Sequence, residues 1–217
     1  MDNITWFGHA SFSFRDKKTG NKIYYVDPFQ LPDKDLDEAD IIFITHAHHD
    51  HLSPNDISYL LKNDTTIVAT SDSLKQLSIS QQKIPVTPDK EYEVKGFRFR
   101  TIPAYNLQPE RPHRKEYGWV GYIFTVNGLK MYHAGDTDYI PEMDNLKSEN
   151  LDIAFLPIGG TYVMTPDEAV QAANAIAAKK TIPIHYKMLL GDKTKEGEEI
   201  FKNGVTNSEV VFLEELR

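Results

Sequence analysis

The chain contains no cysteine, which excludes disulfides, thiolate zinc ligands and cysteine nucleophiles together. It also lacks any apolar run close to the roughly 20 residues that a membrane-spanning helix needs. The first residues begin acidic and do not show the basic segment followed by an apolar one that marks a secretory signal. We therefore expect a cytoplasmic protein that does not enter a membrane.

Positive charge is in the minority. Lys and Arg number 24 against 32 Asp and Glu, a net charge of −8, and such a balance repels nucleic acid and anionic membranes. The expected partner is a small-molecule substrate, with no nucleic acid and no membrane. One basic segment interrupts this pattern: Arg111, Arg114 and Lys115 lie within "RPHRK", which could bind an anion or be an ordinary solvated loop.

The composition is otherwise that of a globular protein. Hydrophobic residues make up 40% and aromatic residues 11% of the 217 residues, which suits one domain over residues 1–217 with a sizeable core. We expect four aromatic residues to be exposed, where they could line a pocket or the interface of a homo-oligomer: Tyr59, Tyr92, Tyr105 and Tyr117.

Short segments rich in β-branched and aromatic residues predict about ten strands. They are residues 4–14, 23–26, 41–45, 66–70, 97–102, 120–126, 130–133, 153–156, 182–185 and 210–213. Between two of them, Asn127-Gly128 is the strongest short-range signal for a two-residue hairpin.

Helix signals are fewer. Ser53 followed by Pro54 predicts a capped helix to about Lys62, and residues 71–77 form a weaker helix prediction. "TPDE" at residues 165–168 is typical of a capping box, and apolar residues follow it on one helix face. Strands and helices alternate in two stretches, about 1–80 and 95–217, which favours two sheets packed face to face with helices outside.

Histidine and aspartate follow three of the predicted strands. In each case an apolar segment leads directly into ligand-type residues: His46, then His133 and Asp136, then His185. Neutral imidazole and carboxylate are the usual ligands of zinc, manganese and other first-row divalent ions, whereas a structural histidine rarely has several such neighbours. We therefore prefer a metal centre to a set of hydrogen-bonded structural residues.

These residues are most crowded in "HAHHDH" at residues 46–51. Residues two apart can reach the same side of an extended turn, so His46 and His48 would share one ion. The following turn into the predicted helix would bring Asp50 and His51 to a second ion. Two ions about 3.5–4 Å apart can polarise a substrate and hold a hydroxide at the same time.

At this point the chain resembles the metallo-β-lactamase superfamily. "THAHHDHLS" is similar to its His-x-His-x-Asp-His signature, "YVDPF" to its first motif, "YHAGDTD" to its bridging-aspartate motif and "IPIHY" to its last histidine motif. "WFGHASFSF" at residues 6–14 resembles the opening of the branch that includes L-ascorbate-6-phosphate lactonase. Together these motifs cover nearly the whole chain.

The resemblance implies an α/β fold, a four-layer αββα sandwich, with two metal ions at the edge where the sheets meet. It implies His46 and His48 as ligands of metal one, Asp136 as the bridge and Asp27 as a residue behind the ligands that holds one of them or the backbone. The implied ligands of metal two are Asp50, His51 and His185.

The remaining ligand of metal one departs from the family, because the short glycine-containing motif that supplies a histidine in many relatives is absent. His113 is our first choice for this ligand and His133 is the alternative. His133 would otherwise contact substrate or orient Asp136. The branch resemblance places His9 beside the metals, where it would support a ligand or contact substrate; the alternative is an ordinary buried, hydrogen-bonded histidine. His49 occupies the variable position of the signature and is not expected to bind metal.

The expected activity is that of a binuclear metal-dependent hydrolase. A hydroxide held by two divalent ions, zinc or manganese, would attack a small anionic lactone or ester. Asp50 could relay a proton, with His133 and His9 as further catalytic residues. The residues predicted to bind the anionic substrate are Arg111, Arg114, Lys115, Tyr186 and Lys187. Two alternatives stay open: a phosphodiesterase or nuclease with the same metal site, and a metal-binding or sensor protein without turnover.

Overall fold

The computed structural model describes residues 3–18, 20 and 22–216. The chain divides into two compact units. The first contains the described residues up to Thr87 together with residues 214–216, and the second contains residues 88–213. Each unit is built on a mixed β-sheet of its own.

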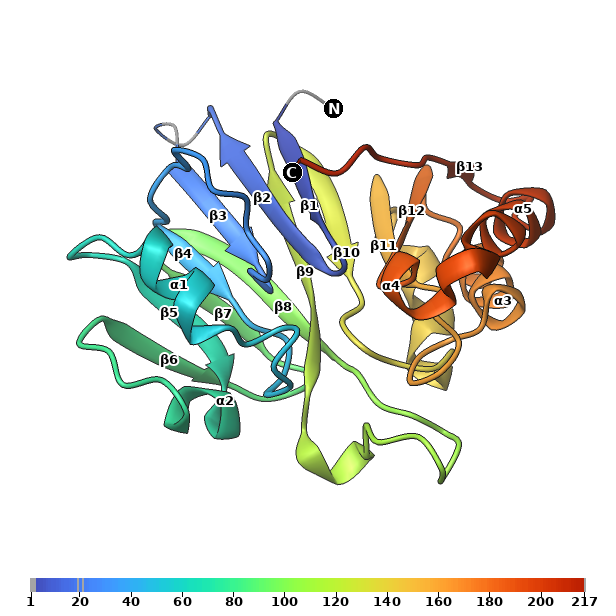
Figure 1. Cartoon of the computed structure of the whole chain (residues 1–217), viewed down its shortest axis with the longest axis horizontal. Helices are drawn as coiled ribbons and strands as arrows, with labels where there is room; N and C mark the ends of the chain where they lie inside the picture. Colours follow the sequence, from blue (N-terminus) through green and yellow to red (C-terminus); the bar gives the residue numbers. More distant parts are fainter. Residues whose placement is uncertain (1–2, 19, 21, 217) are drawn as a thin grey trace. The chain divides into compact units, whose positions relative to one another are not determined.

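The first unit has a six-stranded sheet in the order β1-β2-β3-β4-β5-β6. Neighbouring strands are antiparallel from β1 to β3 and parallel from β3 to β6. The strands are β1 (Ile4–Gly8), β2 (Ser11–Asp16), β3 (Lys22–Val26), β4 (Ile41–Phe43), β5 (Thr66–Thr70) and β6 (Gln82–Val86). Helices α1 (Pro54–Leu60) and α2 (Ser71–Lys75) belong to the same unit (Figure 1).

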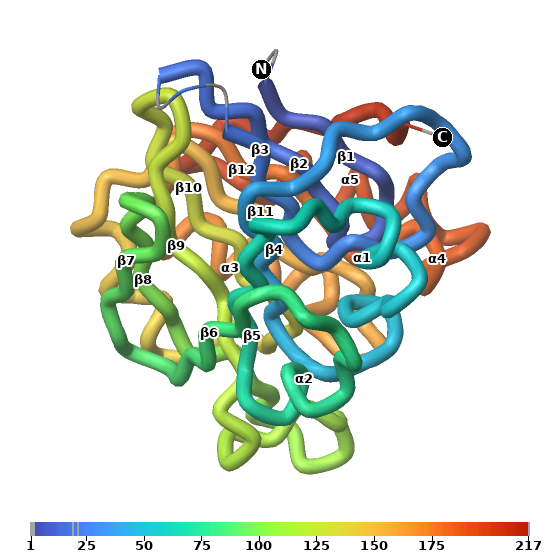
Figure 2. The backbone as a smooth tube through the Cα atoms, turned by 90° about the vertical axis from the view of Figure 1, so that its left-hand side faces the viewer, coloured from blue at the N-terminus to red at the C-terminus, as the bar shows by residue number. Residues whose placement is uncertain are grey.

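The central strands of this sheet are fully buried. All residues of β4 and β5 are buried, as the continuous apolar run of an inner parallel strand predicts, and the two strands lie side by side (Figure 2). Ile42 and Ile67 belong to one core with Ile57 and Leu60 of α1. The sheet and helix therefore fix both ends of the histidine-rich segment that joins β4 to α1.

Local sequence signals set the turns beside that segment. Gly8 and His9 have φ angles of 98° and 50°, and their turn divides the predicted strand 4–14 into β1 and β2. Ser53 caps α1 by accepting a hydrogen bond from the Asp56 N–H at 3.3 Å, with Pro54 in the first turn. The predicted start of α1 is confirmed.

The second unit has a seven-stranded sheet in the order β13-β12-β11-β10-β9-β8-β7. It is antiparallel from β7 to β10 and parallel from β10 to β13. The strands are β7 (Glu91–Val94), β8 (Phe97–Pro103), β9 (Val120–Val126), β10 (Leu129–His133), β11 (Ile153–Pro157), β12 (Lys180–Ile184) and β13 (Glu209–Val210). The α-helices are α3 (Pro166–Ile176), α4 (Lys187–Leu190) and α5 (Thr194–Gly204), and the 3₁₀ helices are η1 (Lys115–Tyr117), η2 (Pro141–Glu149) and η3 (Gly191–Lys193).

Two predictions in this unit are confirmed. Val126 pairs with Leu129 across the Asn127-Gly128 turn, and both turn residues have positive φ, as a two-residue hairpin requires. The capping box before α3 is present, because the Thr165 side chain accepts from the Glu168 N–H and the Glu168 side chain accepts from the Thr165 N–H.

The sequence does not predict β6, β7 or α5. The two strands carry Gln, Lys and Glu and are mostly exposed or half-buried, which weakens their apolar pattern. Helix α5 contains two glycines and only two large apolar residues, Ile200 and Phe201. Among residues 3–18, 20 and 22–216, no helix combines the length and the apolar character needed to cross a membrane.

Candidate metal centre

The first unit gathers one cluster of side chains that could bind metal, most of them after β4. His46 Nε2 and His48 Nδ1 lie 3.1 Å apart, and the His51 ring centroid lies 4.0 Å from that of His46. His9, Asp50 and His51 each offer a ligand atom, and these atoms lie within 4.8 Å of one another. The signature segment therefore brings its donors together with His9, which comes from the β1–β2 turn.

A buried aspartate sets the protonation of two of these rings. Asp27 accepts hydrogen bonds from the Thr45 hydroxyl at 2.7 Å and from His51 Nδ1 at 2.7 Å. Since the hydroxyl donates its proton to Asp27, its oxygen can only accept from His46 Nδ1, which lies 3.0 Å away. His46 and His51 therefore both carry their proton on Nδ1 and present the lone pair of Nε2, as metal-binding imidazole does.

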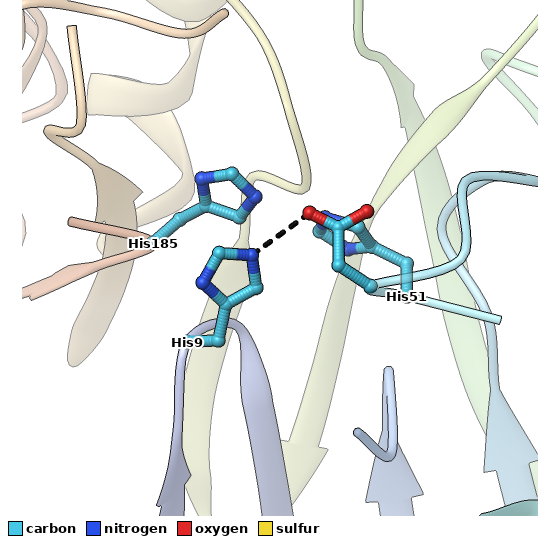
Figure 3. A group of neighbouring side chains, drawn as sticks. His9, His51 and His185 are labelled. Carbon is cyan, nitrogen blue, oxygen red and sulfur yellow. Dashed lines mark hydrogen bonds and ion pairs between the residues drawn. The ribbon is translucent and has the colours of Figure 1, made fainter. Parts of the chain in front are cut away.

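His9, from the β1–β2 turn, is hydrogen-bonded to the signature aspartate. His9 Nε2 lies 2.9 Å from Asp50 Oδ2, as the dashed line in Figure 3 marks. His9 and Asp27 also adopt left-handed backbone conformations, with φ of 50° and 45°. Such conformations are uncommon outside glycine and tend to gather at functional sites.

The second unit gathers another cluster around Asp136. Asp136 Oδ2 lies 3.4 Å from His113 Nε2 and 3.2 Å from His185 Nε2. All three side chains are buried. Asp136 follows β10 and His185 follows β12, whereas His113 comes from the loop between β8 and β9, so a long loop delivers a histidine that the quoted motifs do not contain.

The donor sets fit a divalent ion. Two donors each about 2.1 Å from a tetrahedral zinc ion are roughly 3.4 Å apart, close to the separations of 3.1 to 3.4 Å within the two clusters. Nitrogen and carboxylate donors at this spacing suit zinc and manganese alike.

Two other histidines have different surroundings. His133 is fully buried, and its Nδ1 accepts a hydrogen bond from the Gly135 N–H at 3.3 Å. The His49 side chain is 91% exposed, and its Nδ1 lies 3.8 Å from Asp50 Oδ1. The exposed position of His49 agrees with its place at the variable position of the signature.

The residues predicted to bind an anionic substrate differ in whether carboxylates of the protein already bind them. Arg111 is buried, donates to Asp138, and donates to Glu168 at 3.1 Å. Burial by itself lowers the pKa of the Arg111 guanidinium, but hydrogen bonds and charge from Asp138 and Glu168 raise it above its ordinary value. Its positive charge is therefore neutralised within the protein, which gives no support to a direct contact with substrate.

The other predicted substrate residues lie nearer the surface or are held by carboxylates. Lys115 is exposed and donates to Glu142 at 2.9 Å. The Tyr186 side chain is buried and its hydroxyl donates to Glu198 at 2.7 Å. Arg114 is exposed, and Lys187 is half-buried at the start of α4.

The prediction of exposed aromatic residues is partly wrong. Tyr59 and Tyr117 are exposed, and Tyr92 is half-buried. Tyr105 is buried, because its hydroxyl donates to Glu142 and its backbone is bound by Thr137. A tyrosine at the end of a strand gives no sequence signal for such partners.

Three further residues support the clusters without being predicted from the sequence. Thr45 lies between Asp27 and His46, while Asn106 and Asp138 bind the loop that carries His113. Thr45 and Asp138 belong to the quoted motifs "THAHHDHLS" and "YHAGDTD", which is the signal that could have identified them. Asn106 has no comparable signal.

Comparisons with known proteins identify the family. The family model described as "Beta-lactamase superfamily domain" matches residues 3–185. A UPF0173 metal-dependent hydrolase of Methanoculleus marisnigri is 35% identical over 190 residues, which cover 84% of this chain and 80% of that protein. A UPF0173 metal-dependent hydrolase of Thermococcus onnurineus is 31% identical over 220 residues, which cover 90% and 95% respectively.

Solved structures agree with this result. A crystal structure from Parabacteroides distasonis, of a protein whose proposed activity is that of a metal-dependent hydrolase, is 35% identical with a TM-score of 0.82. The alignment covers 98% of this chain and 93% of that chain. These matches confirm the predicted metallo-β-lactamase fold, with its two mixed sheets and their helices. The chain belongs to the metallo-β-lactamase superfamily and, within it, to the UPF0173 metal-dependent hydrolases.

Proposed function

We propose that this protein is a binuclear metal-dependent hydrolase in which both clusters supply ligands to one metal centre. The residues that would hold the ions are His46, His48 and His113 for metal one, Asp50, His51 and His185 for metal two, and Asp136 for both. The observation that carries the proposal is the donor set, since imidazole nitrogens lie 3.1 to 3.4 Å from each other or from a carboxylate oxygen. Family membership supports the pairing of the two clusters.

Histidine protonation favours His113 over His133 as the remaining ligand. His133 Nδ1 accepts from the Gly135 N–H, so the neutral ring carries its proton on Nε2 and offers no lone pair there. His113 Nε2 faces Asp136 Oδ2 at 3.4 Å. We propose that His133 holds the Ala134–Gly135 turn before Asp136 and does not bind metal.

Two divalent ions supply Lewis acidity and, near neutral pH, a nucleophile derived from water. In the proposed mechanism Asp50 Oδ2 accepts the proton that water releases, and His9 Nε2, 2.9 Å away, shares it. Asp27 keeps the His51 ring in one orientation through the bond to Nδ1. In this mechanism Asp50 and His9 move a proton and Asp27 orients the His51 ring. No side-chain nucleophile is required.

The proposed substrate is a small anionic lactone or ester in the cytoplasm, as the likeness to the lactonase branch suggests. Arg114, which is exposed, and Lys187, which is half-buried, are the cations proposed to bind its anionic group. Lys115 is exposed but is paired with Glu142, and Arg111 is neutralised by Asp138 and Glu168. Zinc and manganese are the proposed metals.

Elemental analysis combined with a substrate panel tests this function. We expect close to two zinc or manganese ions per chain in wild type and in His133→Ala, and about one fewer in His113→Ala. Of these two histidines, His113 is the one that presents a ligand nitrogen. The metal-loaded wild type should hydrolyse lactones or esters.

Other results of these measurements would indicate a different function. Hydrolysis of bis(p-nitrophenyl) phosphate without lactone or ester activity would indicate a phosphodiesterase. Full metal occupancy without hydrolysis of any lactone, ester, thioester or phosphodiester would indicate a protein that binds metal without turnover. Fewer than one ion per chain in the wild type would contradict the metal centre itself.

A further inference from the structure

Asn106 is bound to His113 through both its side chain and its backbone. The His113 N–H donates to Asn106 Oδ1 at 2.8 Å, and His113 Nδ1 lies 3.0 Å from the same oxygen. The Asn106 N–H donates to the His113 carbonyl at 2.6 Å. Two residues seven positions apart are thus joined by three hydrogen bonds, which close the loop that carries His113.

The chemistry of its neighbours fixes which way the Asn106 amide points. Its Nδ2 faces two atoms that can only accept, Asp138 Oδ1 at 2.9 Å and the Tyr162 carbonyl at 3.0 Å. Its Oδ1 faces the His113 N–H, which can only donate. A flipped amide would place an oxygen against two acceptors and an NH₂ against a donor, so only this orientation satisfies every group.

The same orientation determines the tautomer of His113. Nδ1 has two acceptors beside it, Asn106 Oδ1 at 3.0 Å and the Tyr162 carbonyl at 3.0 Å. Nδ1 must therefore carry the proton, which leaves the lone pair of the neutral ring on Nε2. That nitrogen is the one that faces Asp136 Oδ2, and two electron-rich atoms at this distance favour a cation between them.

Asn106 is itself held by the segment that carries Asp136. Asp138 accepts from Asn106 Nδ2 and from two backbone N–H groups, those of Leu107 at 2.8 Å and Gln108 at 3.3 Å. Arg111 also donates to Asp138 and binds the Gly160 carbonyl. Because Asp138 is two residues beyond Asp136, one short segment holds both the carboxylate ligand and the anchor of the loop opposite it.

We propose that Asn106 is a positioning residue that holds His113 in the Nδ1–H tautomer with Nε2 directed at Asp136, and that the Asp138–Arg111 pair keeps Asn106 in place. Only one expected consequence of this role, the effect on metal affinity, rests on the metal centre proposed above. The role gives Arg111 a structural task in place of the substrate contact that the sequence suggests.

The test compares Asn106→Ala with Asn174→Ala, a matched control in the same unit. The Asn174 amide also makes several backbone hydrogen bonds, with Gly204, Thr206 and Asn207, but none of these partners is a metal-ligand residue. Zinc affinity is measured by competition with a chromophoric chelator, after circular dichroism has shown that each variant is folded. The His113 tautomer is read from ¹⁵N shifts of histidine-labelled, metal-free protein, with His113→Gln for assignment.

We expect Nδ1–H for His113 in metal-free wild type and Asn174→Ala, and a mixture of tautomers in Asn106→Ala. Removal of a residue that orients a metal ligand typically lowers metal affinity about 10–100-fold, and we expect such a loss at one of the two zinc ions in Asn106→Ala alone. Equal zinc affinity in the wild type and Asn106→Ala would overturn the proposal, as would an Nε2–H tautomer in the wild type, which needs no variant to detect.

These outcomes separate the two proposals. A wild type with the Nδ1–H tautomer that binds no zinc would contradict the metal centre while supporting the role of Asn106 in fixing His113. A wild type that binds two zinc ions with an Nε2–H tautomer before loading would support the metal centre and contradict the role of Asn106.

Discussion

At the residue scale, Asp40 shows how a buried charge is stabilised outside the two candidate metal-binding clusters. It lies directly before β4 and accepts hydrogen bonds from Lys62 Nζ at 2.8 Å, Lys22 Nζ at 3.1 Å and the Ile23 N–H at 2.9 Å. Burial by itself raises the pKa of Asp40, but these hydrogen bonds lower it below its ordinary value. The ionised carboxylate therefore stabilises the folded state.

We expect Asp40→Asn to lower the free energy of unfolding by about 1–3 kcal/mol at pH 7, because two lysines lose an ionised partner. The folded-state pKa is lowered, so the contribution is complete above the unfolded value of about 3.9 and is lost as the pH falls through the folded value. Urea unfolding between pH 7 and pH 3 measures both effects.

Asp64→Asn is the matched control, since Asp64 is 68% exposed and its carboxylate lies 3.9 Å from the same Lys62. Its effect should stay within about 0.5 kcal/mol. A difference between wild type and Asp40→Asn that does not shrink towards pH 3 would contradict the assignment to this carboxylate.

At the element scale, α3 depends on its cap for a precise beginning. The Thr165 hydroxyl accepts from the Glu168 N–H at 3.2 Å, and Glu168 Oε2 accepts from the Thr165 N–H at 2.7 Å. The buried face of the helix consists of Ala169, Ala172, Ala173 and Ile176. Because three of these four residues are alanines, the helix buries little apolar area. The cap therefore contributes a larger share of the stability of α3.

We expect Thr165→Ala to reduce the free energy of unfolding by about 0.5–2 kcal/mol, because an N–H at the helix start loses its acceptor. Thr165→Ser keeps the hydroxyl and should cost much less. Urea denaturation of the two variants beside wild type makes the measurement. An equal loss in both variants would assign the effect to the lost methyl group and not to the cap.

At the scale of the whole molecule, bound metal should stabilise the fold. Free zinc at 100 times its dissociation constant raises the free energy of unfolding by about 2.7 kcal/mol for one site. For a chain of this size, that corresponds to a rise of roughly 5–10 °C in Tm. Thermal unfolding before and after treatment with a chelator measures this shift. His49→Ala, which removes an exposed side chain, should keep it, whereas an unchanged Tm on chelation of the wild type would argue against a metal centre.

Much of the fold, and the histidines and aspartates of the two candidate clusters, could be predicted because the signals are local. A hairpin at Asn127-Gly128 follows from two residues that tolerate positive φ, and a capping box follows from Thr165 and Glu168. The strands β6 and β7 and the helix α5 could not be predicted, because polar residues or glycines interrupt their periodicity. Pairing with neighbouring strands and packing against other helices form them instead.

By itself, the sequence determined which residues can act as metal ligands and in what order they follow their strands, because ligand chemistry and strand ends are properties of short segments. Only the tertiary structure decided how the donors are used. It pairs Arg111 with Asp138 and Glu168, and it places Asn106 Oδ1 beside His113 Nδ1, the nitrogen that then carries the proton. These partners are brought together by loops that close over long sequence separations, so no local pattern contains them.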